Sequence, residues 1–167
     1  MKRRGFTLIE TLLTLAIASV LISVIAGFVL FLLDNRLRTE IRTDVEFQGI
    51  QTMERLLATV RQAEAVITPA VGVSAEAMSI DVLDNNNDPT TITWGDNTLW
   101  MREGGDPPIA LTSRNIVVSS VSFEYRTTST TPGHVYIEFT LAHANPSGRA
   151  KYAYIKTFYG SASLRSQ

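Results

Sequence analysis

The 167-residue chain contains no cysteine and only two histidines. The absence of thiols excludes disulfide bonds, thiolate chemistry, cysteine-bearing zinc sites and a lipoprotein anchor. The sequence also lacks a phosphate-binding loop, a dinucleotide fingerprint and a Gly-x-Ser-x-Gly nucleophile elbow. We therefore expect a protein that has no enzymatic activity and no resident cofactor.

An excess of basic residues is also missing. The chain has 15 basic and 16 acidic side chains, and its formal net charge is −1. Three of the basic residues, Lys2, Arg3 and Arg4, stand together at the N-terminus, and without them 12 basic residues face 16 acidic ones. No basic stripe marks a nucleic-acid surface, so we expect no direct nucleic-acid partner.

Charge is almost absent from residues 6–33, where Glu10 is the single charged residue. This run exceeds the roughly 20 apolar residues that an α-helix needs to cross a bilayer. It is also longer than the apolar part of a secretory signal, which is about 7–15 residues. Because basic residues directly precede the run, we expect a single-pass protein of the cytoplasmic membrane, with its N-terminus inside and its head outside.

Glu10 is the anomaly of this run. A carboxylate in the middle of a membrane costs about 2.5–3.5 kcal/mol unless it has a partner. The sequence Gly5-Phe6-Thr7-Leu8-Ile9-Glu10 resembles the processing site of type IV pilins and type II secretion pseudopilins. The resemblance implies that prepilin peptidase cleaves after Gly5 and that Phe6 becomes N-methylated. It also implies that Glu10 guides assembly by pairing with the amine of Phe6 in a neighbouring subunit.

The same resemblance implies a set of partners. These are prepilin peptidase, other pilin or pseudopilin subunits, an inner-membrane assembly platform, and membrane lipid before assembly into an extracytoplasmic filament. Two alternatives remain open for the N-terminus. It could be a plain signal anchor in which the glutamate is incidental, or signal peptidase could cut after Ala18, since residues 16–18 match the A-x-A pattern.

Charges return at Asp34, and apolar residues then recur at steps of three to five, which is the pattern of an amphipathic helix. Gly49 is a weak point in this pattern, since glycine costs roughly 1 kcal/mol relative to alanine. The sequence predicts a leader at 1–5, a transmembrane and assembly half of one helix at 6–33, an amphipathic half at 34–67 and a β-rich head at 68–167. The expected buried stripe is Leu37, Ile41, Val45, Ile50, Met53, Leu57 and Val60.

Beyond Pro69 the apolar period changes from about 3.6 to two, which indicates strands separated by Asn, Asp, Gly and Pro clusters. Consecutive hairpins predict one antiparallel sheet whose dry face is covered by the amphipathic helix. The expected fold is α+β: a pilin-like lollipop with a long N-terminal helix packed on an antiparallel β-sheet head. Short strands are expected at 78–83, 90–94, 98–102 and 109–112, and long ones at 117–126, 134–143 and 149–159.

The head carries a resemblance of its own. The segments 99–102, 121–125 and 164–165, together with the order of short strands before long ones, are similar to the J-type pseudopilin and the W-type minor pilin. The aromatic residues near the C-terminus could pack in the core or form an edge that binds a partner, and we favour packing. They are Tyr152, Tyr154, Phe158 and Tyr159.

Asp84, Asn86 and Asp88 place oxygen ligands at alternate positions, which makes them a weak candidate for calcium. An EF-hand loop that begins at Asp84 would need a glycine sixth and a glutamate twelfth, and Pro89 and Gly95 stand there instead. A calcium turn of another kind stays open. We favour a polar hairpin turn, because Asn and Asp tolerate left-handed backbone angles.

These features predict a structural subunit, either a minor pilin or a pseudopilin, of a type IV pilus-like filament or a type II secretion pseudopilus. The alternative is a signal-anchored surface protein whose β head binds a ligand without polymerising.

Overall fold

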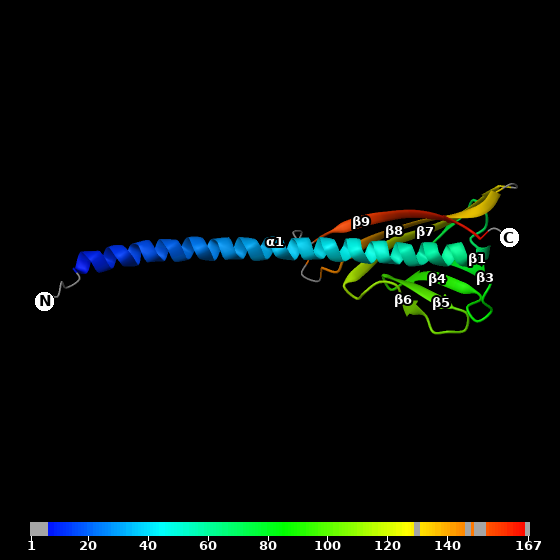
Figure 1. Ribbon diagram of the computed structural model, residues 1–167, viewed down its shortest axis with the longest axis horizontal. Helices are drawn as coiled ribbons and strands as arrows, with labels where there is room; N and C mark the ends of the chain where they lie inside the picture. The colour runs from blue at the N-terminus through cyan, green and yellow to red at the C-terminus, as the bar shows by residue number, and fades with distance from the viewer. Residues whose placement is uncertain (1–6, 129–130, 146–147, 149–152, 166–167) are drawn as a thin grey trace. The chain divides into compact units, whose positions relative to one another are not determined.

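A computed structural model of the chain describes residues 7–128, 131–145, 148 and 153–165. The chain forms two compact units, Met1–Glu40 and Ile41–Gln167. Helix α1 (Leu8–Gln62) begins in the first unit and ends in the second (Figure 1). All the strands belong to the second unit, so the fold is α+β as the sequence predicts.

The described part of the second unit contains nine strands in two antiparallel sheets. The five-stranded sheet has the order β1-β3-β4-β5-β6, and the four-stranded sheet has the order β2-β7-β8-β9. The expectation of a single sheet was therefore wrong. The strands are β1 (Ala63–Thr68), β2 (Ser74–Ala75), β3 (Met78–Val82), β4 (Thr90–Gly95), β5 (Thr98–Glu103), β6 (Ile109–Ala110), β7 (Ile116–Thr128), β8 (Thr131–His143) and β9 (Ile155–Ser163).

The end of α1 differs from the prediction of an amphipathic helix over residues 34–67. The helix ends at Gln62, and Ala63–Thr68 form β1, which pairs with β3. This segment contains the β-branched residues Val66, Ile67 and Thr68, which suit a strand. Pairing with β3 satisfies its backbone and buries Ala63 completely, so tertiary packing overrides the helical pattern.

Helix α1 contacts both sheets within the second unit. The Thr52 hydroxyl donates a hydrogen bond of 3.1 Å to the carbonyl of Leu111, which directly follows the edge strand β6 of the five-stranded sheet. On the other side, the ring of Phe158 in β9 lies directly over Gly49, where an added Cβ would overlap the ring. Figure 1 shows β9 running beside this part of the helix. Gly49 thus lets the helix and β9 approach closely, rather than marking a soft spot.

The buried face of the helix is also shifted from the predicted stripe. Ile50 is 54% exposed and Leu37 is 46% exposed, whereas Leu56 is completely buried. Gly49 and Met53 face β9, and Ile50 lies outside the core. The buried helical residues are Val45, Gly49, Thr52, Met53, Leu56 and Val60.

Strand β8 follows the predicted alternation and β7 departs from it. In β8, Val135, Ile137, Phe139 and Leu141 are all buried, as expected. In β7, a bulge between Val118 and Ser120 inserts one residue. Because one extra residue reverses the faces of a strand, Val118 is buried rather than Val117, and the expected common face of 117, 119, 121, 123 and 125 was wrong.

Polar contacts fix β9 and the segment before it to the helix. The Tyr154 hydroxyl donates a hydrogen bond of 2.8 Å to Glu46 Oε1, and Lys156 Nζ lies 3.2 Å from the same oxygen. The hydrogen bond from Tyr154, followed by that from Lys156, lowers the pKa of Glu46 below its usual value. Arg42 lies over the Tyr154 ring at 5.2 Å. Of the aromatics predicted to pack, Phe158 is buried, Tyr159 is 73% exposed, and Tyr152 falls outside the described residues.

Candidate processing and assembly segment

The predicted processing site lies at the edge of the described chain. Gly5 and Phe6 fall outside the described residues, and helix α1 begins at Leu8. The amides of Glu10 and Thr11 both donate to the carbonyl of Thr7, at 3.1 and 3.2 Å. Glu10 therefore lies in the first turn of the helix, where the helix dipole favours an acidic side chain by about 0.3–1 kcal/mol.

The hydroxyl groups of this segment are turned back onto the helix. Thr11 donates to the carbonyl of Leu8, and Thr14 lies 2.9 Å from the carbonyls of both Glu10 and Thr11. Ser19 and Ser23 likewise donate to carbonyls at 2.8 Å. Such back-bonding satisfies hydroxyl groups without water. Among the described residues from Leu8 to Leu33, Glu10 is the one charged side chain, and it has no hydrogen-bond or ion-pair partner for its carboxylate.

The apolar side chains of the segment have no cover within the described residues. All the large ones from Leu8 to Leu33 are between 47% and 81% exposed. The most apolar stretch of α1 has a mean hydropathy of 2.8, and by length and composition the helix could cross a membrane. A segment of this kind needs lipid or other apolar helices around it. This segment can insert into lipid or bind other apolar helices, but its described side chains suggest no catalytic reaction.

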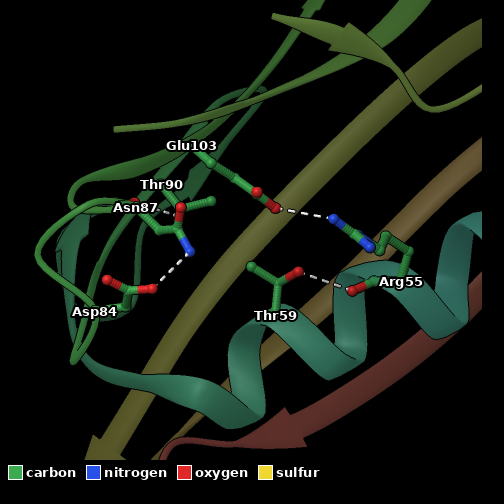
Figure 2. Close-up of polar contacts among 6 residues, drawn as sticks. All are labelled: Arg55, Thr59, Asp84, Asn87, Thr90 and Glu103. Carbon is green, nitrogen blue, oxygen red and sulfur yellow. Dashed lines mark hydrogen bonds and ion pairs between the residues drawn. The ribbon is translucent and has the colours of Figure 1, made fainter. Parts of the chain in front are cut away.

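The candidate calcium residues form a hydrogen-bonded turn between β3 and β4. The amide of Asn86 donates to Asp84 Oδ1 at 3.0 Å, and the side-chain amide of Asn87 donates to Asp84 Oδ2 at 3.2 Å (Figure 2). Both carboxylate oxygens of Asp84 are thus engaged within the turn itself. Asp88 precedes a cis peptide bond to Pro89. The geometry is that of the polar turn that the sequence favours.

A groove of about 770 Å³ runs between this turn and the last turns of α1. Figure 2 shows Arg55 and Thr59 on the helix, with Asp84, Asn87, Thr90 and Glu103 opposite. Arg55 Nη2 lies 2.9 Å from Glu103 Oε1 and joins the two walls. The pair is half exposed, and exposed pairs of this kind contribute about 0–1 kcal/mol.

The two histidines, His134 and His143, both lie in β8. His134 Nδ1 is 3.1 Å from the hydroxyl of Ser163, and the amide of His143 donates to the carbonyl of Tyr154. Within the described residues, no group of three or more His, Asp or Glu side chains gathers where it could hold a metal. A cluster that sequence reasoning missed lies on β7 and β8, where Arg126 bridges Glu124 and the ring of Tyr136.

Comparison with known proteins gives one finding. A family described as the prokaryotic N-terminal methylation motif matches residues 1–26. The match spans Gly5, Phe6 and Glu10 and reaches into the apolar part of α1. Neither the curated proteins nor the solved structures yield a match to this chain. The motif and the apolar helix together support a type IV pilin-like precursor that is anchored in a membrane, from a class of structural rather than enzymatic proteins.

Proposed function

We propose that this chain is a structural subunit, a minor pilin or a pseudopilin, of a type IV pilus-like filament or a type II secretion pseudopilus. The observation that carries the proposal is the methylation motif at residues 1–26, placed directly on an apolar helix with a lone carboxylate. In this proposal prepilin peptidase cleaves between Gly5 and Phe6, and the new amine of Phe6 is methylated.

The action of the protein is then mechanical. Before assembly, residues 6–33 lie in the cytoplasmic membrane, with the N-terminus inside and the head outside. The segment moves from lipid into a bundle of equivalent helices on the assembly platform. The transfer costs little, because apolar side chains exchange lipid for other apolar side chains.

Glu10 sets the position of each subunit in this bundle. The methylated amine of Phe6 in a neighbouring subunit is a cation at the depth of the Glu10 carboxylate. A misplaced subunit leaves one charge of the pair buried without a partner, which typically costs about 3–5 kcal/mol. The pair therefore selects one axial register.

We base the proposed finer identity of the subunit on its head. Short strands β3 to β6 precede the long strands β7 to β9, and this order supports a J-type pseudopilin or a W-type minor pilin. The proposed partners are the peptidase, other subunits and the assembly platform, with no enzymatic activity, resident cofactor or direct nucleic-acid partner. A calcium ion at Asp84, Asn86 and Asp88 is not part of the proposal, because Asp84 is already engaged within its turn.

The experiment is the intact mass of the protein isolated from membranes, with and without active prepilin peptidase. The proposal predicts loss of residues 1–5 and gain of one methyl group when the peptidase is active. A full-length chain in the presence of active peptidase would instead support the signal-anchored binding protein. Cleavage after Ala18 would contradict both functions.

A further inference from the structure

The outer face of the four-stranded sheet carries two exposed tyrosines. Tyr136 on β8 is 45% exposed and Tyr159 on β9 is 73% exposed. The neighbouring residues of the two strands turn inward, where Ile137 and Phe158 are buried. Exposed tyrosines are typical of binding surfaces, where this residue is enriched.

Each tyrosine has a glutamate as its directly opposed neighbour on the adjacent strand. Glu124 of β7 is paired with Tyr136, and Glu138 of β8 is paired with Tyr159. Directly opposed residues on one face have Cβ atoms about 4.5–5.5 Å apart, so each carboxylate lies beside its ring. The surface thus contains the same glutamate–tyrosine pair twice, on successive strand pairs.

The first of these pairs already holds a cation. Arg126 Nε and Nη2 donate to the two carboxylate oxygens of Glu124 at 2.7 and 2.9 Å. The same guanidinium group lies 4.8 Å from the centre of the Tyr136 ring. The hydrogen bond from Arg126 lowers the pKa of Glu124, and the carboxylate in turn raises the pKa of Arg126. A two-point ion pair and a cation–π contact therefore act on one arginine.

The second pair differs from the first in the part of the chain that the structure describes. Among the described residues, Glu138 has no hydrogen-bond or ion-pair partner, and the Tyr159 ring has no cation over it. A hollow of about 220 Å³ lies between the two pairs, and Ser122, Glu124, Arg126, Tyr136, Glu138 and Tyr159 are in its wall. The wall carries two carboxylates and one guanidinium group, so it is short of one positive charge.

We propose that Glu138 and Tyr159 form a docking site for an arginine side chain of a partner protein. The guanidinium group would stack on the Tyr159 ring and donate two hydrogen bonds to Glu138, as Arg126 does at the neighbouring pair. Arginine fits better than lysine, because its planar group both stacks on a ring and binds a carboxylate through two donors. The proposal is independent of the filament role, since the site lies entirely on the head.

The test uses the full chain in detergent and a dye-labelled (Gly-Arg)4 peptide, with the citrulline counterpart as the matched probe. Citrulline keeps the shape of arginine and removes its charge. We expect the arginine peptide to bind, as read by fluorescence anisotropy, and the citrulline peptide to bind about tenfold more weakly or not at all. NMR of ring-labelled tyrosines should place the largest shift at Tyr159.

Two variants localise the site. Glu138→Gln and Tyr159→Leu should each weaken binding of the arginine peptide by about three- to tenfold. Glu54→Gln, at an exposed glutamate of α1, should leave it unchanged, and thermal unfolding checks that each head is folded. Equal binding of both peptides, unchanged affinity in Glu138→Gln, a largest shift at Tyr136, or no binding of the arginine peptide would each overturn the proposal.

Discussion

The two units of the molecule treat apolar side chains in opposite ways. From Leu8 to Leu33 every large apolar side chain is at least 47% exposed, whereas in the second unit a continuous set from Val45 to Leu164 forms a buried core. The two glycines of α1 beyond Leu8 show the same contrast. A Cβ added at Gly27 would meet nothing within 4 Å, and one added at Gly49 would overlap Phe158.

The second unit therefore contains a buried core of its own, whereas the described apolar side chains from Leu8 to Leu33 are all exposed. The head buries this core, although some of its large apolar side chains, such as Phe47, Leu83 and Ile155, stay exposed. The large apolar side chains from Leu8 to Leu33 have no such core, and in the proposed function lipid or other helices cover them while a neighbouring subunit supplies a cation for Glu10. Substitutions in the two units should therefore have separate consequences, for assembly in the first and for folding in the second.

The largest effect is expected from blocking cleavage. Gly5→Val should leave the chain uncleaved and confined to the membrane fraction, with no detectable protein in the sheared filament fraction, because the peptidase site is lost. Immunoblots of the two fractions measure this. Gly105→Val is the matched control, since it adds the same atoms to a glycine of the second unit with open surroundings. Filament-fraction protein at the normal level in Gly5→Val would contradict the proposed processing.

The next effect concerns the head. Gly49→Ala should lower the free energy of unfolding by about 1–2 kcal/mol, since overpacking costs about 1–3 kcal/mol and better helix propensity returns up to about 1 kcal/mol. Denaturant unfolding of the full chain in detergent measures it. Gly27→Ala should leave the head unchanged. Adding Phe158→Leu to Gly49→Ala should cost less than the sum of the two single changes, and strict additivity would contradict the close packing of Gly49 on Phe158.

The smallest effect is a pH dependence. Because Tyr154 and Lys156 lower the pKa of Glu46 from its usual 4.5, the ionised form favours the folded head. This contribution is complete above pH 4.5 and is lost as the pH falls through the lowered pKa. Glu46→Gln should remove that part of the acid-induced loss of stability. Thermal unfolding at pH values from about 6 to about 3 measures this. An identical pH profile in Glu54→Gln and Glu46→Gln would count against the contact.

Sequence patterns predicted the regular parts of this fold well. The strict alternation in β8 gave its buried residues correctly, and turn residues marked the limits of β3, β4 and β5 to within one residue. Where the prediction was wrong, the cause was tertiary. The bulge after Val118 reversed the face of β7, and pairing with β3 turned Ala63–Thr68 from helix to strand.

The candidate sites also differ in whether local sequence or tertiary structure decides them. The motif at Gly5, Phe6 and Glu10 is readable from local sequence, because processing and insertion depend on an extended local pattern. The arginine and tyrosine arrangement on the outer sheet face was not readable, since the register of β7, β8 and β9 decides which residues oppose one another. A pattern of Glu-x-Arg on one strand and Tyr-x-Glu on the next is the only trace that it leaves.

The most direct test of the division of tasks is the incorporation of Glu10→Ala. We would measure the amount of the variant in sheared filaments relative to membranes, with Thr14→Ala as the control, because Thr14 bonds only to its own helix. We expect at least about a tenfold loss of incorporation with unchanged unfolding of the head, since the amine of a neighbour is left buried without its partner. Normal incorporation of Glu10→Ala would contradict the pairing and, with it, the assembly role given to the first unit.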